Sequence, residues 1–102
     1  MTHHAGHLIR SARHAKSITQ RDLAAQVGLN FTYISKIEHG TSAAPSDFSI
    51  LRLADALDID RDALFVAFAK IPPDIVIQLR GNAELTQQIR QWLAPPDRRE
   101  TT

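Results

Sequence analysis

Apolar residues recur at helical spacing along most of this chain, and glycine, proline or polar residues separate the periodic stretches. The clearest periodic segment covers residues 17–40, SITQRDLAAQVGLNFTYISKIEHG. Gly28 interrupts it and Gly40 ends it, and glycine most readily takes the left-handed conformation that terminates a helix. The pattern therefore predicts two short helices joined by a tight turn. The expected inward-facing residues are Leu23, Ala24 and Val27 in the first helix, and Ile37 with either Tyr33 or Ile34 in the second.

Capping residues stand at the start of both helices. Thr19 is followed three residues later by Asp22, an acidic variant of the capping box. Asn30 is a good N-cap for the second helix. Two helices this short bury little by themselves, and a three- to four-residue turn containing glycine between them is the signature of a helix-turn-helix.

Three further helices are expected around this pair. The first runs from about Gly6 to Lys16. The other two are FSILRLADAL and RDALFVAFA, the second capped by Asp60. The start of FSILRLADAL stays open, because either Pro45 is the first helical residue or Ser46 or Asp47 is the cap. Their expected apolar faces are Leu8, Ile9, Ala12 and Ala15; Phe48, Leu51, Leu53, Ala54 and Leu57; and Leu64, Phe65 and Phe68.

The pair Pro72–Pro73 breaks the pattern, because proline lacks a backbone donor and pushes the preceding residue out of helical geometry. Pro73 can open a helix, IVIQLR, and Asn82 can cap another, AELTQQIRQWL. We expect an all-α protein in which five helices form a domain over residues 1–70. One or two helices follow in residues 71–94, and residues 95–102 form a disordered tail.

Charge is unevenly distributed along the chain, although its net value is only +1. Counting Lys and Arg against Asp and Glu, residues 1–40 carry +3, residues 41–69 carry −3 and residues 70–102 carry +1. A basic N-terminal part supports contact with nucleic acid. The acidic part is expected to face away from it.

Several classes of protein are disfavoured by composition. The absence of cysteine excludes disulfides and thiolate chemistry. No apolar run approaches the roughly 20 residues that span a bilayer, and the start lacks the apolar core of a secretory signal, so a cytoplasmic protein is expected. His3, His4 and His7 are expected to be solvated, with phosphate contact or metal binding as alternatives. No strand-to-helix serine elbow or Gly-rich phosphate loop is present, so we expect no enzyme, cofactor or metal.

The run T-Q-x-x-L-A-x-x-V-G-L-N-x-x-Y-I-S-K-I-E-x-G, from Thr19 to Gly40, closely resembles the helix-turn-helix of Xre/Cro-type phage and bacterial repressors. The resemblance extends from about Leu8 to Ala69 and implies a five-helix domain like that of the lambda repressor. It also implies that Arg13, late in the first helix, pairs with Glu38, late in the third, and is thereby turned toward a phosphate. The alternative is two unrelated surface charges.

In this motif the second helix of the pair enters the major groove with its N-terminal residues at the base edges. Lys36 can donate to guanine O6 or N7, Thr32 can bind a base through its hydroxyl or methyl, and Phe31 can contact thymine methyl groups. Related repressors often carry a polar residue at the position of Phe31. The expected base-reading residues are Asn30, Phe31, Thr32 and Lys36.

Phosphate contacts set the register of such a protein on DNA and make its binding depend on salt. Gln20 stands where the family places a glutamine against the DNA backbone. Tyr33 has a competing structural role under the turn, and Ser35 could instead face solvent. The expected phosphate-binding residues are Arg13, Gln20, Arg21, Tyr33, Ser35, Thr41 and Ser42.

The last two helices carry more apolar residues than a short appendage needs. We interpret them as a dimer interface with Trp92 as its aromatic anchor. The alternative is that both helices fold onto the core of the same monomer. The expected interface residues are Ile75, Val76, Leu79, Leu85, Ile89, Trp92 and Leu93.

The resemblance implies a sequence-specific regulator that binds double-stranded DNA, expected to be a homodimeric repressor acting on a palindromic operator of its own or a neighbouring operon. The alternative is an antitoxin-type module that neutralises a toxin and regulates its own operon. The run Lys70–Asp74, KIPPD, is similar to small repressors encoded beside ImmA/IrrE-type zinc metallopeptidases, including those of phage-defence operons. This similarity implies a metallopeptidase as a further candidate partner.

Overall fold

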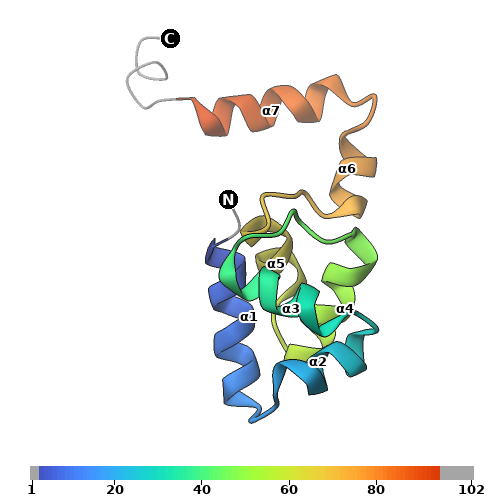
Figure 1. The fold of residues 1–102 in the computed structure, drawn as a ribbon. Helices are drawn as coiled ribbons and strands as arrows, with labels where there is room; N and C mark the ends of the chain where they lie inside the picture. The colour runs from blue at the N-terminus through green and yellow to red at the C-terminus, as the bar shows by residue number, and fades with distance from the viewer. Residues whose placement is uncertain (1–2, 95–102) are drawn as a thin grey trace. The chain divides into compact units, whose positions relative to one another are not determined.

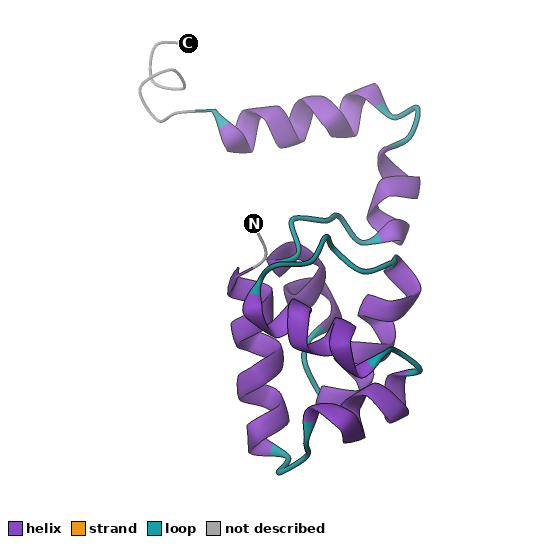
Figure 2. Cartoon of the chain, in the orientation of Figure 1, coloured by secondary structure: helices purple, strands orange, loops and turns teal. Residues whose placement is uncertain are grey.

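The computed structural model describes residues 3–94, which contain seven α-helices and no strand (Figures 1 and 2). The helices are α1 (His3–Ala15), α2 (Gln20–Val27), α3 (Phe31–His39), α4 (Asp47–Leu57), α5 (Arg61–Ala67), α6 (Pro73–Leu79) and α7 (Ala83–Leu93). Two compact units divide the chain: Met1–Pro72 holds α1–α5, and Pro73–Thr102 holds α6 and α7. The predicted all-α fold class is confirmed. The predicted tail, 95–102, lies outside the described residues.

The capping groups of α2 and α3 form as the sequence predicts. Thr19 Oγ1 accepts a hydrogen bond from the backbone N–H of Asp22 at 3.0 Å, and Asp22 Oδ2 accepts one from the N–H of Thr19 at 2.9 Å. Gly28 ends α2 in the left-handed region with φ 69°. Asn30 Oδ1 accepts from the N–H of Thr32 at 2.7 Å and so caps α3. These local bonds set the turn between α2 and α3.

The core of the first unit gathers apolar side chains from all five of its helices. Its largest fully buried members are Ile9 in α1, Leu23 in α2, Ile34 and Ile37 in α3, Ile50 and Leu53 in α4, and Leu64 and Phe65 in α5. Helix α3 packs against both α1 and α2, as Figure 1 shows. The core therefore fixes α3 from two sides.

Helix α4 differs from the prediction on one face. Ser46 is its N-cap and Asp47 its first residue. The predicted inward position of Phe48 is wrong, because its side chain is 66% exposed while Ile50 is fully buried. Buried positions of α4 recur at three- and four-residue intervals from Ile50, and Phe48, two residues earlier, therefore points to the opposite side of the helix.

Gly6 brings α1 close to the end of α3. A Cβ atom added at Gly6 would lie 2.5 Å from the carbonyl oxygen of Ile37 and 2.6 Å from that of Glu38. These are backbone atoms of α3, so a side chain at Gly6 would force the helices apart. Helix α1 also starts earlier than predicted, at His3, and its last residue, Ala15, is exposed rather than inward-facing.

The second unit is a pair of helices without a buried residue. Pro73 opens α6, and Asn82 Oδ1 accepts from the N–H of Leu85 at 3.0 Å to cap α7, both as predicted. Neither helix contains a buried side chain. Among the described residues of the whole chain, no helix is both long and apolar enough to cross a membrane.

Candidate DNA-binding surface

Helix α3 presents one face to solvent and anchors the other in the core. Ile34 and Ile37 are fully buried, whereas Phe31 is 36% exposed. Thr32 and Lys36 are also exposed. Helical spacing of 100° per residue places the exposed positions on one side of α3. Three of the four predicted base-reading residues therefore share an accessible face, and the fourth, Asn30, caps its start.

A buried ion pair joins α1 to α3. Arg13 Nε donates to Glu38 Oε2 at 2.7 Å, and Arg13 Nη2 donates to Glu38 Oε1 at 3.0 Å. Both side chains are almost completely enclosed. Arg13 Nη1 also donates to the backbone oxygen of Ile18 at 2.9 Å. The bidentate geometry and the buried setting make this contact a fixed attachment for the last turn of α3.

Gln20, the first residue of α2, joins the same carboxylate. Its Nε2 donates to Glu38 Oε1 at 3.1 Å, and Arg10 Nε lies 4.0 Å from that oxygen. Burial by itself raises the pKa of Glu38, but the hydrogen bonds from Arg13 and Gln20 and the neighbouring arginine charges lower it more. The net pKa of Glu38 is lowered, so the carboxylate stays ionised. The pKa of Arg13 is raised, chiefly by the same hydrogen bond.

This network changes the roles expected for two predicted phosphate ligands. All three guanidinium nitrogens of Arg13 have acceptors or ring contacts inside the unit, including His14 Nε2 at 3.3 Å, and the side chain is only 9% exposed. Arg13 is thus held by Glu38 and by the backbone of Ile18, and it also lines the open hollow beside the start of α2, so its role toward a phosphate stays a prediction. Gln20 is half-buried and gives one amide hydrogen to Glu38. Its second amide hydrogen leaves it able to act as a phosphate donor.

Arg21 and Phe31 form a stacked pair between α2 and α3. The Arg21 Cζ atom lies 4.2 Å from the centroid of the Phe31 ring. Both residues line a shallow, open hollow, together with residues around the start of α2. At the start of α2 the capping box already bonds the N–H groups of Asp22 and Thr19, so the guanidinium of Arg21 supplies a cation beside the hollow. Chemically, the hollow suits a phosphate group beside an aromatic ring.

The remaining predicted phosphate ligands lie along α3 and in the loop after it, and one of them, Ser35, is half-buried in the middle of the helix. Tyr33 is half-buried, and its hydroxyl donates to the carbonyl of Ala43 at a long 3.5 Å. Thr41 is exposed, and its hydroxyl donates to the carbonyl of Lys36 at 3.3 Å. Ser42 is half-buried. Their role toward DNA stays a prediction.

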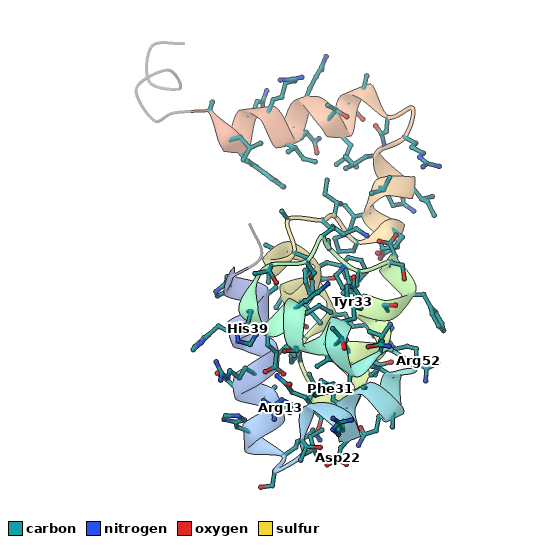
Figure 3. The ribbon with its side chains drawn as sticks, viewed as in Figure 1. Arg13, Asp22, Phe31, Tyr33, His39 and Arg52 are labelled. Carbon is teal, nitrogen blue, oxygen red and sulfur yellow. The ribbon has the colours of Figure 1, made fainter. Side chains whose placement is uncertain are left out.

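His39 is a candidate that the sequence reasoning missed. Its Nδ1 lies 2.7 Å from the backbone oxygen of Ser35, one turn earlier in α3 (Figure 3). That contact orients the ring, and the residue is exposed. The i, i+4 spacing from Ser35 and the i+8 spacing from Phe31 place His39 on the exposed face of α3. The spacing of these residues in the sequence could have predicted this position of His39.

The predicted interface residues of α6 and α7 fall into two groups. Val76, Leu79, Leu85 and Ile89 are half-buried. Ile75, Trp92 and Leu93 are exposed, Trp92 to 73% and Leu93 to 77%. A tryptophan with this much accessible surface has apolar area available to a partner. Over residues 3–94, no group of three or more His, Asp or Glu residues is arranged to hold a metal ion.

A bundle of short helices whose second and third members, α2 and α3, follow the helix-turn-helix pattern, with α3 exposed on one face of a closed core, defines a class of nucleic-acid-binding domain. Comparison with known proteins agrees with this class. The family model described as "Helix-turn-helix" matches residues 9–64. The chain therefore belongs to the helix-turn-helix family, as its sequence predicted.

The proteins that this chain resembles include one from Sinorhizobium fredii and one from Mycobacterium tuberculosis, both named as uncharacterized HTH-type transcriptional regulators. The first is 38% identical over 74 residues, which are 72% of this chain and 36% of the relative. The second is 29% identical over 92 residues, 86% of this chain and 65% of the relative. The chain thus spans between about a third and two thirds of the length of these relatives.

A solved complex of SinR protein and SinI protein has a similar fold. The match has a TM-score of 0.55 and 21% sequence identity, and it covers 95% of this chain and 98% of the matched chain. At this identity the likeness concerns the fold alone. It supports an all-helical arrangement that continues beyond the first five helices.

Proposed function

We propose that this protein is a sequence-specific regulator of transcription that binds double-stranded DNA through α3. The observation that carries the proposal is the double attachment of α3. Ile34 and Ile37 bury one face, and Glu38 is tied to Arg13 and Gln20, while the opposite face stays accessible. A rigid helix displayed in this way fits the B-DNA major groove, where each base pair shows a distinct pattern of donors and acceptors.

The contacts divide into base reading and backbone positioning. Lys36 is exposed and carries an ammonium group suited to guanine O6 or N7, and Thr32 has both a hydroxyl and a methyl group. Bases would be contacted by Asn30, Phe31, Thr32 and Lys36. Phosphates would be contacted by Gln20, Arg21, Tyr33, Ser35, Thr41 and Ser42, with His39 added at the end of α3. Arg13 supports α3 through Glu38 and, because it lines the hollow beside the start of α2, remains a candidate phosphate contact.

The second part of the proposal is that the protein acts as a homodimer. The absence of buried residues in α6 and α7, with Trp92 and Leu93 exposed, leaves an apolar surface suited to a second copy of the chain. Two copies of α3 related by a two-fold axis would read half-sites about one helical turn apart, so the operator would be palindromic. A dimer placed on a promoter would repress it by occlusion.

The test measures binding of the full chain to the DNA upstream of its own gene by fluorescence anisotropy at several salt concentrations. Lys36→Ala should weaken binding to the operator by about tenfold or more and change binding to unrelated DNA less. Gln20→Ala should weaken both, because a phosphate contact carries no sequence information. Equal losses on both DNAs for Lys36→Ala would contradict base reading, and no rise in anisotropy with either DNA would contradict the proposal itself.

A second candidate function is an antitoxin-type module that uses the same apolar surface of α6 and α7 to hold another protein. The observation that favours it is the exposure of Trp92 and Leu93, which a heterologous partner could also cover. The similar solved structure is itself a complex of two named proteins. A full chain that stays monomeric at all concentrations while binding operator DNA would favour this candidate over the homodimer.

Regulation by a metallopeptidase stays a prediction based on the resemblance of Lys70–Asp74. Cleavage in α6 or α7 would remove the proposed dimer surface and release the operator. Mass spectrometry of the protein recovered after induction tests this idea. A chain that remains intact while repression is lifted would contradict it.

A further inference from the structure

The pairing of Arg21 with Phe31 places a cation over an aromatic ring at the start of the proposed reading helix. The Cζ–centroid distance of 4.2 Å is well within the roughly 6 Å range of a cation–π contact. The two residues come from different helices, and each backbone position is set by a cap, Thr19 for α2 and Asn30 for α3. The N-caps of α2 and α3 therefore fix the backbone positions of both residues in the stack.

The stack has consequences for both side chains. A guanidinium lying over a ring keeps its N–H donors in its own plane, where they remain free to reach an anion. Phe31 gains a neighbour that restrains its ring, and it is still 36% exposed. The unit thus combines a restrained apolar surface with a cation that lines the hollow at the start of α2.

We propose that Arg21 is a positioning residue for Phe31, and that together they read the C5 methyl group of a thymine in the operator. In this arrangement the exposed part of the Phe31 ring contacts the methyl group in the major groove. The in-plane N–H groups of Arg21 donate to a phosphate of the adjoining backbone. The inference rests on the proposed function, which it deepens by naming a base and a coupled pair of side chains.

Thymine is favoured by the chemistry of the groove. It is the base that presents a methyl group there, whereas the other bases present only donors and acceptors. A phenylalanine ring placed against a donor or acceptor would remove water without replacing its hydrogen bond, which is unfavourable. A ring placed against a methyl group buries apolar surface on both sides.

The experiment removes only the methyl group. The full chain is first used to select a duplex from randomised DNA, and each thymine of the selected site is then replaced by uracil in both half-sites. For the natural chain, at least one replacement should weaken binding about fourfold per half-site, which corresponds to roughly one buried carbon. The affinity ratio between thymine and uracil duplexes at that position is the readout.

Three variants test which side chains cause the difference in affinity between the thymine and uracil duplexes. Phe31→Ala should bring the ratio close to one. Arg21→Lys keeps a positive charge, so the salt dependence of binding should persist, but the planar guanidinium over the Phe31 ring is lost and the ratio should fall toward one. Arg52→Lys is the matched control, because Arg52 lies over the ring of Phe48 at 5.6 Å, in a pair that contains no residue of α3. Its ratio should stay at the natural value.

The outcomes separate the inference from the function on which it rests. If the selected duplex is bound but no uracil replacement matters, methyl reading is overturned and DNA binding stands. If the ratio survives in Arg21→Lys, Arg21 is not a positioning residue. If no duplex can be selected by a folded chain, the proposed function fails together with the inference. Thermal unfolding of each variant checks that it is folded.

Discussion

Glu38 shows how one side chain can serve both stability and the proposed reading surface. Its carboxylate is enclosed and receives hydrogen bonds from Arg13 and Gln20, so it links α1, α2 and α3. Exposed pairs such as Arg61–Asp55 contribute little, because solvent screens them. Removing one partner of a buried pair is costlier, on the order of 3 kcal/mol or more, because the other charge is left without compensation.

The pH dependence of stability should report this carboxylate. The pKa of Glu38 is lowered in the folded chain, so its contribution is complete above the ordinary glutamate value of about 4.3 and is lost as the pH falls through the folded pKa. The urea midpoint of the natural protein should therefore drop in acid. Glu38→Gln should be less stable at pH 7 but lose less on acidification.

Glu84→Gln is the control for that series. Glu84 is exposed on α7, outside the first unit, and its replacement should leave the acid dependence of that unit unchanged. Identical acid slopes for Glu38→Gln and the natural chain would mean that the buried carboxylate does not determine the acid sensitivity.

Gly6 leads to a second prediction at the scale of a single residue. Replacing glycine by alanine within a helix ordinarily stabilises it by about 0.5–1 kcal/mol. At Gly6 the new methyl group would meet two backbone oxygens of α3 at 2.5 and 2.6 Å, so Gly6→Ala should destabilise the protein by about 1–3 kcal/mol. Urea unfolding checks this, with Ser11→Ala on the exposed side of α1 as the control.

Sequence reasoning reached some of these residues and missed others for identifiable physical reasons. The caps at Thr19 and Asn30 were predictable, because a cap depends on residues within one turn. The close approach at Gly6 was not, because it depends on a contact between α1 and α3 that local pattern does not encode. The stack of Arg21 on Phe31 was missed for the same reason.

At the scale of the element, α3 combines a cap with a proposed base contact in Asn30. Asn30→Ala should lose the hydrogen bond to the N–H of Thr32 and cost about 1 kcal/mol of stability. Asn30→Ser should keep a capping oxygen and so keep most of that stability, while losing the amide that could touch a base. Thermal unfolding and operator affinity, measured on both variants, separate the two roles.

The two variants lead to different conclusions. If Asn30→Ser binds the operator as tightly as the natural chain, Asn30 only caps α3 and leaves base reading to its neighbours. If Asn30→Ser is stable but binds weakly, the amide contributes directly to recognition.

Helix α4 illustrates why the buried face of a helix is harder to predict than the presence of the helix. The apolar run FSILRLADAL contains more apolar residues than one helical face can hold, so two phases compete. The cap at Ser46 and packing around Ile50 select the phase that exposes Phe48. The helix and its approximate bounds followed from the sequence, but the choice between faces required the core.

At the scale of the whole molecule, the two units should behave separately. A chain ending at Pro72 should retain the unfolding transition of the first unit, because its core comes from α1–α5. Trp92→Ala in the full chain should weaken the proposed dimer by roughly 10-fold or more while leaving that transition in place. Analytical ultracentrifugation over a range of concentrations measures the first effect and circular dichroism the second.

Arg90→Ala provides a control on the same helix, because Arg90 is an exposed charged residue of α7. It should change self-association less than Trp92→Ala. If Trp92→Ala abolishes the unfolding transition of the first unit, the C-terminal helices contribute to the monomer core after all, and the homodimer proposal loses its main support.

The lack of any buried residue in α6 and α7 has a consequence for how a controlled gene would respond to the concentration of this protein. In the proposed homodimer, two short helices without a buried residue of their own would gain order from association, so self-assembly and local folding would become one equilibrium. At low abundance, the population of assembled protein then rises with the square of its concentration. A gene controlled by such a protein would respond more steeply to the concentration of its regulator than a gene controlled by a monomer of equal affinity.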